Sequence, residues 1–364
     1  ESSKEDEGEN EKVKTLTITL HDTDNCGSSL QAFSLQKFLL SNGIDNEIID
    51  YVPEYAKNNG SPIKSLLRKL IFYRDSNERD KKFHQFVVDY LHLTEKKYRS
   101  FQELDGTPPE ADFYITGSDQ LWNATYRCGN DPAFYLDFVK TGKKLAYAVS
   151  LGREVIPKDN LELVKKYAQD YQWLSVREKS SVKQLEGVLN GKRVDYVCDP
   201  VLLNTVEIYL QMQAPRLIKD PYILVYMAQI PDAPSMDAFI EAIQKKVNGK
   251  VVLIGSYRNR CACDIHKRDV APAEFLSLIA NAEYIISNSF HATMFSMIYE
   301  KQFATVLPER NGTRIKEILD YTDLTEHAIS SISVPWIEDY TEVRNKLAHF
   351  RTQSQQILLN ELGK

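Results

Sequence analysis

The sequence predicts an α/β protein with two domains that face each other across a cleft, each built from a parallel sheet flanked by helices. Three observations predict this fold class. Short apolar segments typical of strands alternate with segments of helical periodicity along most of the chain. A stretch of weak periodicity at about 204–220, marked by Asn204, Pro215 and Asp220-Pro221, separates two such sets. The length of 364 residues suits two domains of ordinary size.

The first set of elements is assigned to an N-terminal domain over residues 15–208. Leu16–Leu20 alternates with period two, as a strand does, and residues 27–42 carry apolar side chains at helical spacing before Gly43. Ile48–Tyr51 has the composition of the next strand. Such a strand–helix–strand unit opens a doubly wound α/β domain. Further strands are predicted at 112–116, 144–150, 174–176 and 194–198.

Two segments depart from this alternation. The first twelve residues are acidic and lack large apolar side chains, so residues 1–14 are predicted to form a disordered acidic tail. Residues 55–105 are rich in Lys, Arg and aromatic residues, with apolar positions three and four apart in 66–72 and 83–91. We interpret 55–105 as a helical insertion that covers the first domain or its cleft.

The second set of elements is assigned to a C-terminal domain over residues 209–340. Strands are predicted at 222–227, 251–254, 283–287 and 303–307, and helices at 235–247, 272–280, 290–299 and 314–321. The final segment is long and amphipathic. We predict that residues 341–364 form a helix that packs across the junction between the domains.

The composition argues against several classes of function. With 45 Lys and Arg against 51 Asp and Glu, the net charge is −6, so no overall basic field favours nucleic acid. No apolar run approaches the roughly 20 residues of a membrane-spanning helix. Five scattered cysteines do not suggest a disulfide framework and fit a reducing compartment, from which we expect a cytoplasmic location. Cys261 and Cys263 with His266 offer too few ligands for a zinc site, so no metal site is predicted.

Functional residues are expected in the loops that follow the strands, because ligands of open parallel sheets bind at the carboxyl ends of the strands. The loop 21–29 holds Asn25, Gly27 and Ser28 where a helix begins, a geometry that can bind an anion. The alternative is an ordinary capped turn.

A second polar loop follows the strand at 113–115. In chain order it contains Gly117, Ser118, Asp119, Gln120 and Trp122. A carboxylate, an amide and a flat aromatic face together suit a sugar. In the alternative interpretation, Asp119 caps a helix and Trp122 belongs to the core.

Arg177 follows the strand at 174–176. Its guanidinium could clamp a carboxylate or a phosphate through two hydrogen bonds, and Glu178 could orient it or start the next helix. The commoner fate of such a pair is a surface ion pair.

His291 and Ser289 follow the strand at 284–286 and open an apolar helix. An ordinary imidazole pKa of about 6.5 suits proton transfer near neutral pH. Arg258 and Arg314 lie in further loops of this half and are candidates for binding an anion.

Five segments together resemble the polysaccharide pyruvyl transferase family in order and spacing. They are NCGSSLQAFSLQKFL, ITGSDQLWN, SVREKSS, CDPVLL and IISNSFHATMFSMIYEKQF, and the resemblance runs from about residue 16 to about residue 325. GSDQLW and SNSFHATMFSMI are its most specific pieces. The resemblance implies a GT-B-like fold with two Rossmann-like domains around a cleft. The insertion at 55–105 departs from the family's core pattern.

The resemblance further implies a transferase that moves a pyruvyl group from phosphoenolpyruvate to a sugar. The sugar would belong to a cell-surface or capsular polysaccharide, or to its lipid-linked precursor, and the product would be a pyruvate ketal. Such a reaction needs anion clamps, an acid and a base, and no obligatory cofactor. The implied partners are phosphoenolpyruvate and a carbohydrate acceptor, with peripheral contact to a membrane-bound glycan assembly.

The same resemblance suggests roles for individual residues. His291 matches the functional His of the family and would act as an acid or as a phosphate-binding cation. Arg177 matches the Arg of the family's SxRE segment and would clamp the donor. Asp119 would hold or deprotonate a sugar hydroxyl, with Gln120 and Trp122 shaping the acceptor subsite. Ser118 and Ser289 would donate hydrogen bonds.

The sequence is also compatible with two other functions. A nucleotide-sugar-dependent glycosyltransferase of the GT-B type would need a base- and ribose-binding pocket in the C-terminal half, where Glu274, Glu283 and Glu309 are the available carboxylates. A catalytically inactive glycan-binding or scaffold protein would retain the fold alone. The joint presence of His, Arg and Asp at strand ends argues against that last function.

Overall fold

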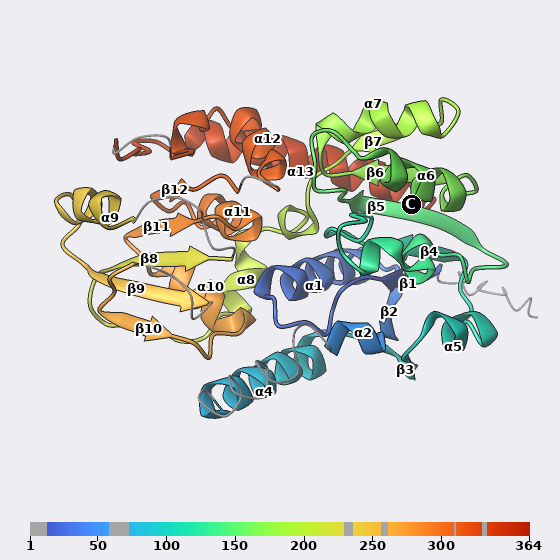
Figure 1. The fold of residues 1–364 in the computed structure, drawn as a ribbon, viewed down its shortest axis with the longest axis horizontal. Helices are drawn as coiled ribbons and strands as arrows, with labels where there is room; N and C mark the ends of the chain where they lie inside the picture. Colours follow the sequence, from blue (N-terminus) through green and yellow to red (C-terminus); the bar gives the residue numbers. More distant parts are fainter. Residues whose placement is uncertain (1–12, 58–72, 229–235, 256–260, 309–310, 330–332) are drawn as a thin grey trace, which may run out of the picture.

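The computed structural model contains two parallel sheets that lie side by side and are flanked by helices (Figure 1). It describes residues 13–57, 73–228, 236–255, 261–308, 311–329 and 333–364. The predicted fold class, α/β with two parallel sheets flanked by helices, is confirmed.

The N-terminal sheet has seven strands in the order β3-β2-β1-β4-β5-β6-β7, and all the pairings are parallel. The strands are β1 (Lys14–Ile18), β2 (Asp45–Tyr51), β3 (Leu93–Tyr98), β4 (Phe113–Thr116), β5 (Lys143–Val149), β6 (Trp173–Val176) and β7 (Val194–Tyr196). The helices are α1 (Cys26–Ser41), α2 (Glu54–Lys57), α4 (Tyr73–Tyr90), α5 (Phe101–Gly106), α6 (Lys158–Tyr167) and α7 (Lys179–Val188). Short 3-10 turns lie at Cys128–Asn130, Pro132–Tyr135 and Pro200–Leu202.

The C-terminal sheet has five parallel strands in the order β10-β9-β8-β11-β12. They are β8 (Tyr222–Met227), β9 (Lys250–Gly255), β10 (Ile265–Lys267), β11 (Tyr284–Ser287) and β12 (Phe303–Thr305). The helices are α8 (Val206–Met212), α9 (Asp237–Gln244), α10 (Pro272–Ala280), α11 (Phe290–Ile298), α12 (Thr313–Tyr321) and α13 (Thr341–Glu361), with a 3-10 turn at Thr325–His327.

The prediction that residues 55–105 form a purely helical insertion is wrong. It contains β3, which pairs with β2 at the edge of the sheet, Ile48 opposite Leu93 and Asp50 opposite Lys97. Charged residues occupy the middle of β3, as is common on edge strands, and they conceal its strand character in the sequence. The helical part over 83–91 coincides with α4, whereas 66–72 lies outside the described residues.

The N-terminal tail was predicted to reach residue 14. Strand β1 already begins at Lys14, which pairs with Asp45 of β2, and residues 1–12 lie outside the described part of the chain. Strand β10 was not predicted, because three half-buried residues carry almost no periodic signal.

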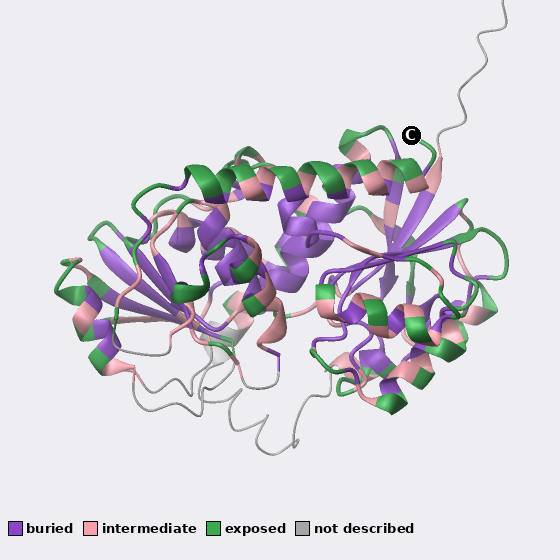
Figure 2. Ribbon diagram, turned by 90° about the horizontal axis from the view of Figure 1, so that it is seen from above, coloured by how far each residue is buried: buried purple, intermediate pink, exposed green. Residues whose placement is uncertain are grey.

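The apolar core is continuous between the two halves. One cluster of buried residues joins Leu30 and Phe33 of α1 to Phe275 of α10 and Phe295 of α11, and the buried helices between the sheets are plain in Figure 2. The N-terminal half therefore packs on the C-terminal half through helices rather than through a linker alone.

Helix α13 contacts elements of both halves. The Phe350 ring lies 4.9 Å from that of Tyr196 at the end of β7 and 4.8 Å from that of Tyr321 in α12. The Ser354 hydroxyl accepts a hydrogen bond from the Cys198 N–H at 2.9 Å. Among the described residues, no helix combines the length and the hydropathy needed to cross a bilayer.

Candidate active site

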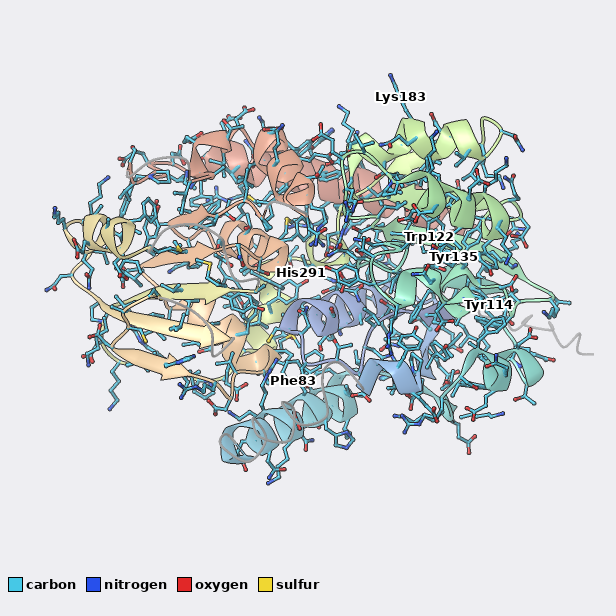
Figure 3. The ribbon with its side chains drawn as sticks, in the orientation of Figure 1. Phe83, Tyr114, Trp122, Tyr135, Lys183 and His291 are labelled. Carbon is cyan, nitrogen blue, oxygen red and sulfur yellow. The ribbon has the colours of Figure 1, made fainter. Side chains whose placement is uncertain are left out.

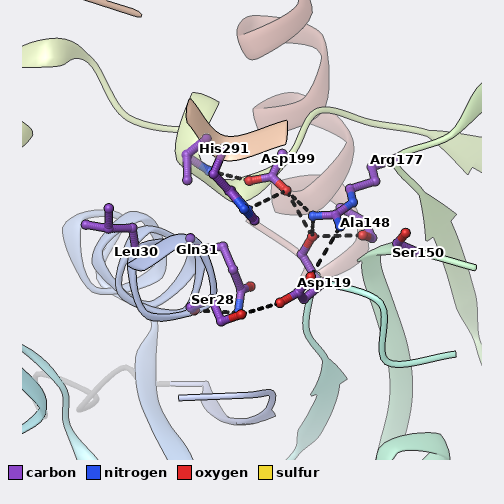
Figure 4. A network of polar contacts seen from close by, with 12 residues as sticks. Ser28, Leu30, Gln31, Asp119, Ala148, Ser150, Arg177, Asp199 and His291 are labelled. Carbon is purple, nitrogen blue, oxygen red and sulfur yellow. Dashed lines mark hydrogen bonds and ion pairs between the residues drawn. The ribbon is translucent and has the colours of Figure 1, made fainter. Parts of the chain in front are cut away.

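Five polar side chains from distant parts of the sequence meet where the two sheets face each other (Figure 4). The Arg177 guanidinium, after β6, donates to Asp199 Oδ2 at 2.5 Å and to Asp119 Oδ1 at 3.4 Å. Asp119, after β4, accepts a hydrogen bond of 2.5 Å from the Ser28 hydroxyl on α1. His291, in the first turn of α11, places Nε2 3.6 Å from Asp199 Oδ2. The structure thus brings together the His, Arg and Asp that the sequence proposes.

Arg177 is the most enclosed member of this group. Its side chain is 1% exposed, and it also donates to the Ser118 hydroxyl at 3.2 Å. Burial opposes its charge, but Asp199, Asp119 and Glu178 outweigh burial and raise the pKa of Arg177 above its ordinary value. Its two terminal nitrogens therefore both donate to the chain's own carboxylates. Arg177 is better placed to hold these carboxylates in position than to clamp a ligand by itself.

Asp199 is the central residue that the sequence analysis missed. It follows β7 and binds Arg177, the Ser118 hydroxyl at 3.3 Å and the Val201 N–H at 3.1 Å. Burial would raise its pKa, but the interactions with His291 and Arg177 hold the pKa well below the usual range. The signal was present in the sequence, because Asp199 directly follows a predicted strand and precedes a proline.

Asp119 has an unusual backbone. Its φ of 84° lies in the left-handed region, which non-glycine residues seldom adopt, and it forms an isolated parallel bridge to Val149. Strain of this kind is concentrated at functional sites. Burial would raise its pKa, yet Arg177 and His291 lower it below the ordinary value, so the carboxylate is ionised at neutral pH. Its side chain is 13% exposed, more than that of the other buried members.

Arg314 of α12 brings a second guanidinium to the site. The centroid of the Phe290 ring lies 4.9 Å from Arg177 Cζ and 5.3 Å from Arg314 Cζ, so both cations contact this ring. Burial and the charge of Arg177 lower the pKa of Arg314 to about 10. A small cavity beside both arginines is lined by Asp199, Phe290 and apolar residues of β7, α11 and α12.

Several buried polar atoms here have no hydrogen-bond partner among the described residues. They are the Nε atoms of Arg177 and Arg314, His291 Nε2 and Glu178 Oε2. An unsatisfied buried donor or acceptor costs about 1–3 kcal/mol, so several in one place suggest a missing ligand. Within the described ranges, no group of three or more His, Cys, Asp or Glu side chains could hold a metal ion.

The other predicted site residues have mainly structural contacts. Asn25 caps α1 by accepting the Gly27 N–H at 2.9 Å. Ser289 caps α11, its hydroxyl accepting the Ala292 N–H at 3.4 Å. Gln120 is half-buried and accepts a hydrogen bond from Asn123 at 2.7 Å.

Gly117 and Arg258 are the two remaining candidates. A Cβ atom on Gly117 would lie 2.9 Å from Cβ of Thr19, so glycine is needed there for packing. Arg258 lies outside the described residues.

The prediction that Trp122 faces a sugar is wrong. Its side chain is 0% exposed, its indole N–H donates to the Phe134 carbonyl at 2.9 Å, and its ring stacks on Tyr135 with centroids 5.2 Å apart (Figure 3). A tryptophan with its only donor satisfied and both faces covered stabilises the core of the N-terminal half. The alternative interpretation from the sequence is the correct one for this residue.

Gly27 is important for the site because it has no side chain. A Cβ atom at this position would lie 2.1 Å from Nδ1 and 2.6 Å from Cγ of His291, so only glycine lets the imidazole pack against the start of α1. The sequence analysis places Gly27 in a loop that can bind an anion, and in the structure the group that approaches it is the imidazole of His291.

We expect Gly27→Ala to displace His291 and to lower both stability and turnover. Overpacking of a tight contact costs about 1–3 kcal/mol, which thermal denaturation would detect. Gly187→Ala in α7 is the matched control, since a Cβ there meets nothing within 4 Å. A Gly27→Ala protein with unchanged melting temperature and activity would contradict this role of Gly27.

Solved structures similar to this chain share its two-sheet architecture at low sequence identity. A putative UDP-N-acetylglucosamine 2-epimerase from Listeria monocytogenes has a TM-score of 0.52 at 9% identity, covering 95% of this chain and 91% of its own. UGT89C1 of Arabidopsis thaliana, complexed with UDP-L-rhamnose, has a TM-score of 0.48 at 12% identity, covering 97% and 99%. The first of these likenesses establishes the GT-B-like fold and nothing about the ligand.

The sequence itself gives the more specific assignment. No curated protein sequence matches the chain. The family model described as polysaccharide pyruvyl transferase matches residues 25–309, well over half of the 364 residues. That range contains the Ser28, Asp119, Arg177, Asp199 and His291 cluster. The protein is a transferase, and the chain belongs to the polysaccharide pyruvyl transferase family.

Proposed function

We propose that the protein transfers a pyruvyl group from phosphoenolpyruvate to a carbohydrate acceptor and releases phosphate. The observation that carries this proposal is a cluster of buried nitrogens on His291, Arg177 and Arg314 that make no hydrogen bond among the described residues, beside two buried carboxylates. A ligand with several anionic oxygens would satisfy these nitrogens. The membership in the pyruvyl transferase family supports the same class of donor.

The donor end of the site is proposed to lie at Arg314 and His291. Phosphoenolpyruvate carries a phosphate and a carboxylate, which guanidinium and imidazolium groups bind through charge-assisted hydrogen bonds. His291 also lies in the first turn of α11, where the helix dipole favours an anion. Arg177 would fix the negative charges of Asp119 and Asp199 beside the donor.

The acceptor end is proposed to lie at Asp119 and Ser28. An ionised carboxylate accepts a hydrogen bond from a sugar hydroxyl and can accept its proton as bonding to carbon develops. Ser28 already donates to Asp119, so the carboxylate is oriented before the acceptor binds. Ser118 holds Arg177 and Asp199 from the opposite side.

The proposed reaction balances without any other reactant. His291 donates a proton to the methylene carbon of phosphoenolpyruvate, and the carbon that bears the phosphate becomes oxocarbenium-like. One sugar hydroxyl forms a C–O bond to that carbon and loses its proton to Asp119. The C–O bond to phosphate breaks, and the second hydroxyl closes the ketal as it loses its proton. The sugar loses two hydroxyl protons in total. The new methyl group gains one proton and the released phosphate gains the other.

Binding of the donor can be tested by thermal shift. At about 100 times its dissociation constant, phosphoenolpyruvate should stabilise the protein by about 2.7 kcal/mol. UDP-sugars at the same concentration test the glycosyltransferase alternative. We expect Arg314→Gln to abolish most of the shift, with Lys316→Gln, exposed on the same helix, as the control. A shift with UDP-sugars and none with phosphoenolpyruvate would overturn the proposal.

Turnover is tested by phosphate release. A panel of polymeric and lipid-linked saccharides is supplied with phosphoenolpyruvate, and the ketal is detected on the acceptor by mass spectrometry. Acceptor-dependent phosphate release with ketal formation is the expected result. Donor binding without release on any acceptor would favour the inactive binding protein.

We further infer that the enzyme works in the cytoplasm. All five cysteines are free thiols, and three of them, Cys26, Cys128 and Cys198, are buried. Free thiols fit a reducing compartment. Contact with a membrane-bound glycan assembly, where a lipid-linked acceptor would be presented, belongs to the same proposal.

A further inference from the structure

The N-terminus of α7 is capped by a residue from the other half of the molecule. Both carboxylate oxygens of Glu317, on α12, accept backbone hydrogen bonds, Oε2 from the Lys179 N–H at 2.6 Å and Oε1 from the Ser180 N–H at 3.0 Å. Helices α7 and α12 lie on the same side of the molecule, at the top of Figure 1. A carboxylate at a helix N-terminus is favoured both by the free N–H groups and by the dipole.

The residue that would ordinarily cap α7 is turned elsewhere. Glu178 occupies the N-cap position, but its side chain makes no capping hydrogen bond. It is fully buried, accepts a hydrogen bond from the Ser150 hydroxyl and lies 3.7 Å from Arg177 Nε. Because the Glu178 carboxylate contacts Ser150 and Arg177, the first N–H groups of α7 need another acceptor, and Glu317 supplies it.

Glu317 lies one helical turn after Arg314, so the two side chains share one face of α12. Arg314 is the guanidinium beside Phe290 whose Nε has no partner among the described residues. Arg177 lies against the same Phe290 ring, and its charge repels that of Arg314, whereas Glu178, Asp119 and Asp199 attract it. No ion pair with Arg314 is seen within the described chain, so the position of its guanidinium depends on that of α12.

We propose that Glu317 is a positioning residue that fastens α12 to the start of α7 and thereby keeps Arg314 in the site for an anionic ligand. The clamp joins the two halves, since α7 packs on the N-terminal sheet and α12 on the C-terminal half. The inference rests on the proposed function only for the identity of the anion, a phosphate-bearing donor. It needs no contact between Glu317 and that donor.

The test compares Glu317→Ala with Asp320→Ala, which removes an exposed carboxylate from the same helix. Titration calorimetry with inorganic phosphate and with phosphoenolpyruvate gives the two affinities. We expect Glu317→Ala to weaken both about tenfold or more, because losing a hydrogen bond from a charged guanidinium to the anion lowers affinity by about a factor of ten. Asp320→Ala should bind like the wild type.

Two further measurements separate positioning from general damage. KM for the donor should rise in Glu317→Ala, with kcat at saturation changed less than threefold. Hydrogen exchange of the Lys179 and Ser180 amides should become faster, while β6 and β7 stay protected. Glu317→Gln retains one acceptor oxygen, and its intermediate affinity shows the effect even if the alanine variant folds poorly.

The outcomes distinguish this inference from the proposed function. If the wild type binds phosphate and loses that binding in Glu317→Ala, yet never uses phosphoenolpyruvate, the proposed function fails and the role of Glu317 stands. If Glu317→Ala and Glu317→Gln bind phosphate as tightly as Asp320→Ala does, the role of Glu317 is overturned. A wild type that binds neither anion overturns both.

Discussion

Replacing His291 by glutamine is expected to lower kcat by a factor of about 10² to 10⁴, the range measured when a positioned acid or base is lost. Glutamine is close in size to histidine and can donate its amide N–H to Asp199, so the packing against Gly27 and the fold should survive. It has no proton to exchange near neutral pH and no positive charge. Phosphate release with an active acceptor measures the loss, and circular dichroism verifies the fold.

Two comparisons make the His291 result interpretable. His349→Gln, exposed on α13, is the matched control and should be fully active. His291→Lys restores a positive charge without an imidazole, so partial recovery would identify a phosphate-binding cation and no recovery a proton donor. Wild-type turnover in His291→Gln would refute both roles.

Replacing Asp199 by alanine is expected to cost about 3–5 kcal/mol of stability, the largest such loss of any site residue. Removing one partner of a buried ion pair leaves the other charge buried without compensation, and Arg177 is 1% exposed. Asp199→Asn keeps the shape and removes the charge, so it should lose less. Chemical denaturation gives the free energy of unfolding, with Asp170→Asn as the control, since its pair with Lys144 is exposed on the Asp side.

The same substitution predicts a change in acid stability. The pKa values of Asp199 and Asp119 are lowered in the folded protein, so both carboxylates stabilise the fold above the unfolded aspartate pKa of about 3.9. That stabilisation is lost as the pH falls through the folded pKa values. Asp199→Asn should therefore show a shallower loss of stability below about pH 4. If the free energy of unfolding of Asp199→Asn fell with decreasing pH as it does in the wild type, the burial of an ionised Asp199 would be contradicted.

Most of the fold could be predicted because the strands of parallel sheets are short, apolar and regularly spaced. Tyr222–Met227 and Pro272–Ala280 have the predicted bounds. One edge strand of each sheet was not predicted. Strand β3 carries Glu95, Lys96 and Lys97 in its middle, and β10 is three residues long, so neither has the apolar pattern that identifies a strand.

The site could be predicted only as far as a strand end locates a residue. That rule located Asp119, Arg177 and His291, and it would have located Asp199. A position at a strand end does not show which arginine forms hydrogen bonds with carboxylates. Arg177 does so and Arg314 Nε has no such partner among the described residues, because these bonds depend on side chains that meet from both halves. It also misassigned Trp122, since the direction of a side chain after a strand depends on a turn that the sequence does not specify.

The continuous apolar cluster that joins α1, α10, α11 and α13 has a consequence for how the chain can be divided. The cluster places Leu30 and Phe33 of α1 together with Phe275 and Phe295 of the C-terminal half, so we expect a fragment ending near residue 215 to expose part of this shared core. We expect neither piece to fold by itself, although each contains a complete sheet. We therefore expect the two halves to unfold in a single transition, and gene fusions or truncations of this enzyme should keep 13–364 intact.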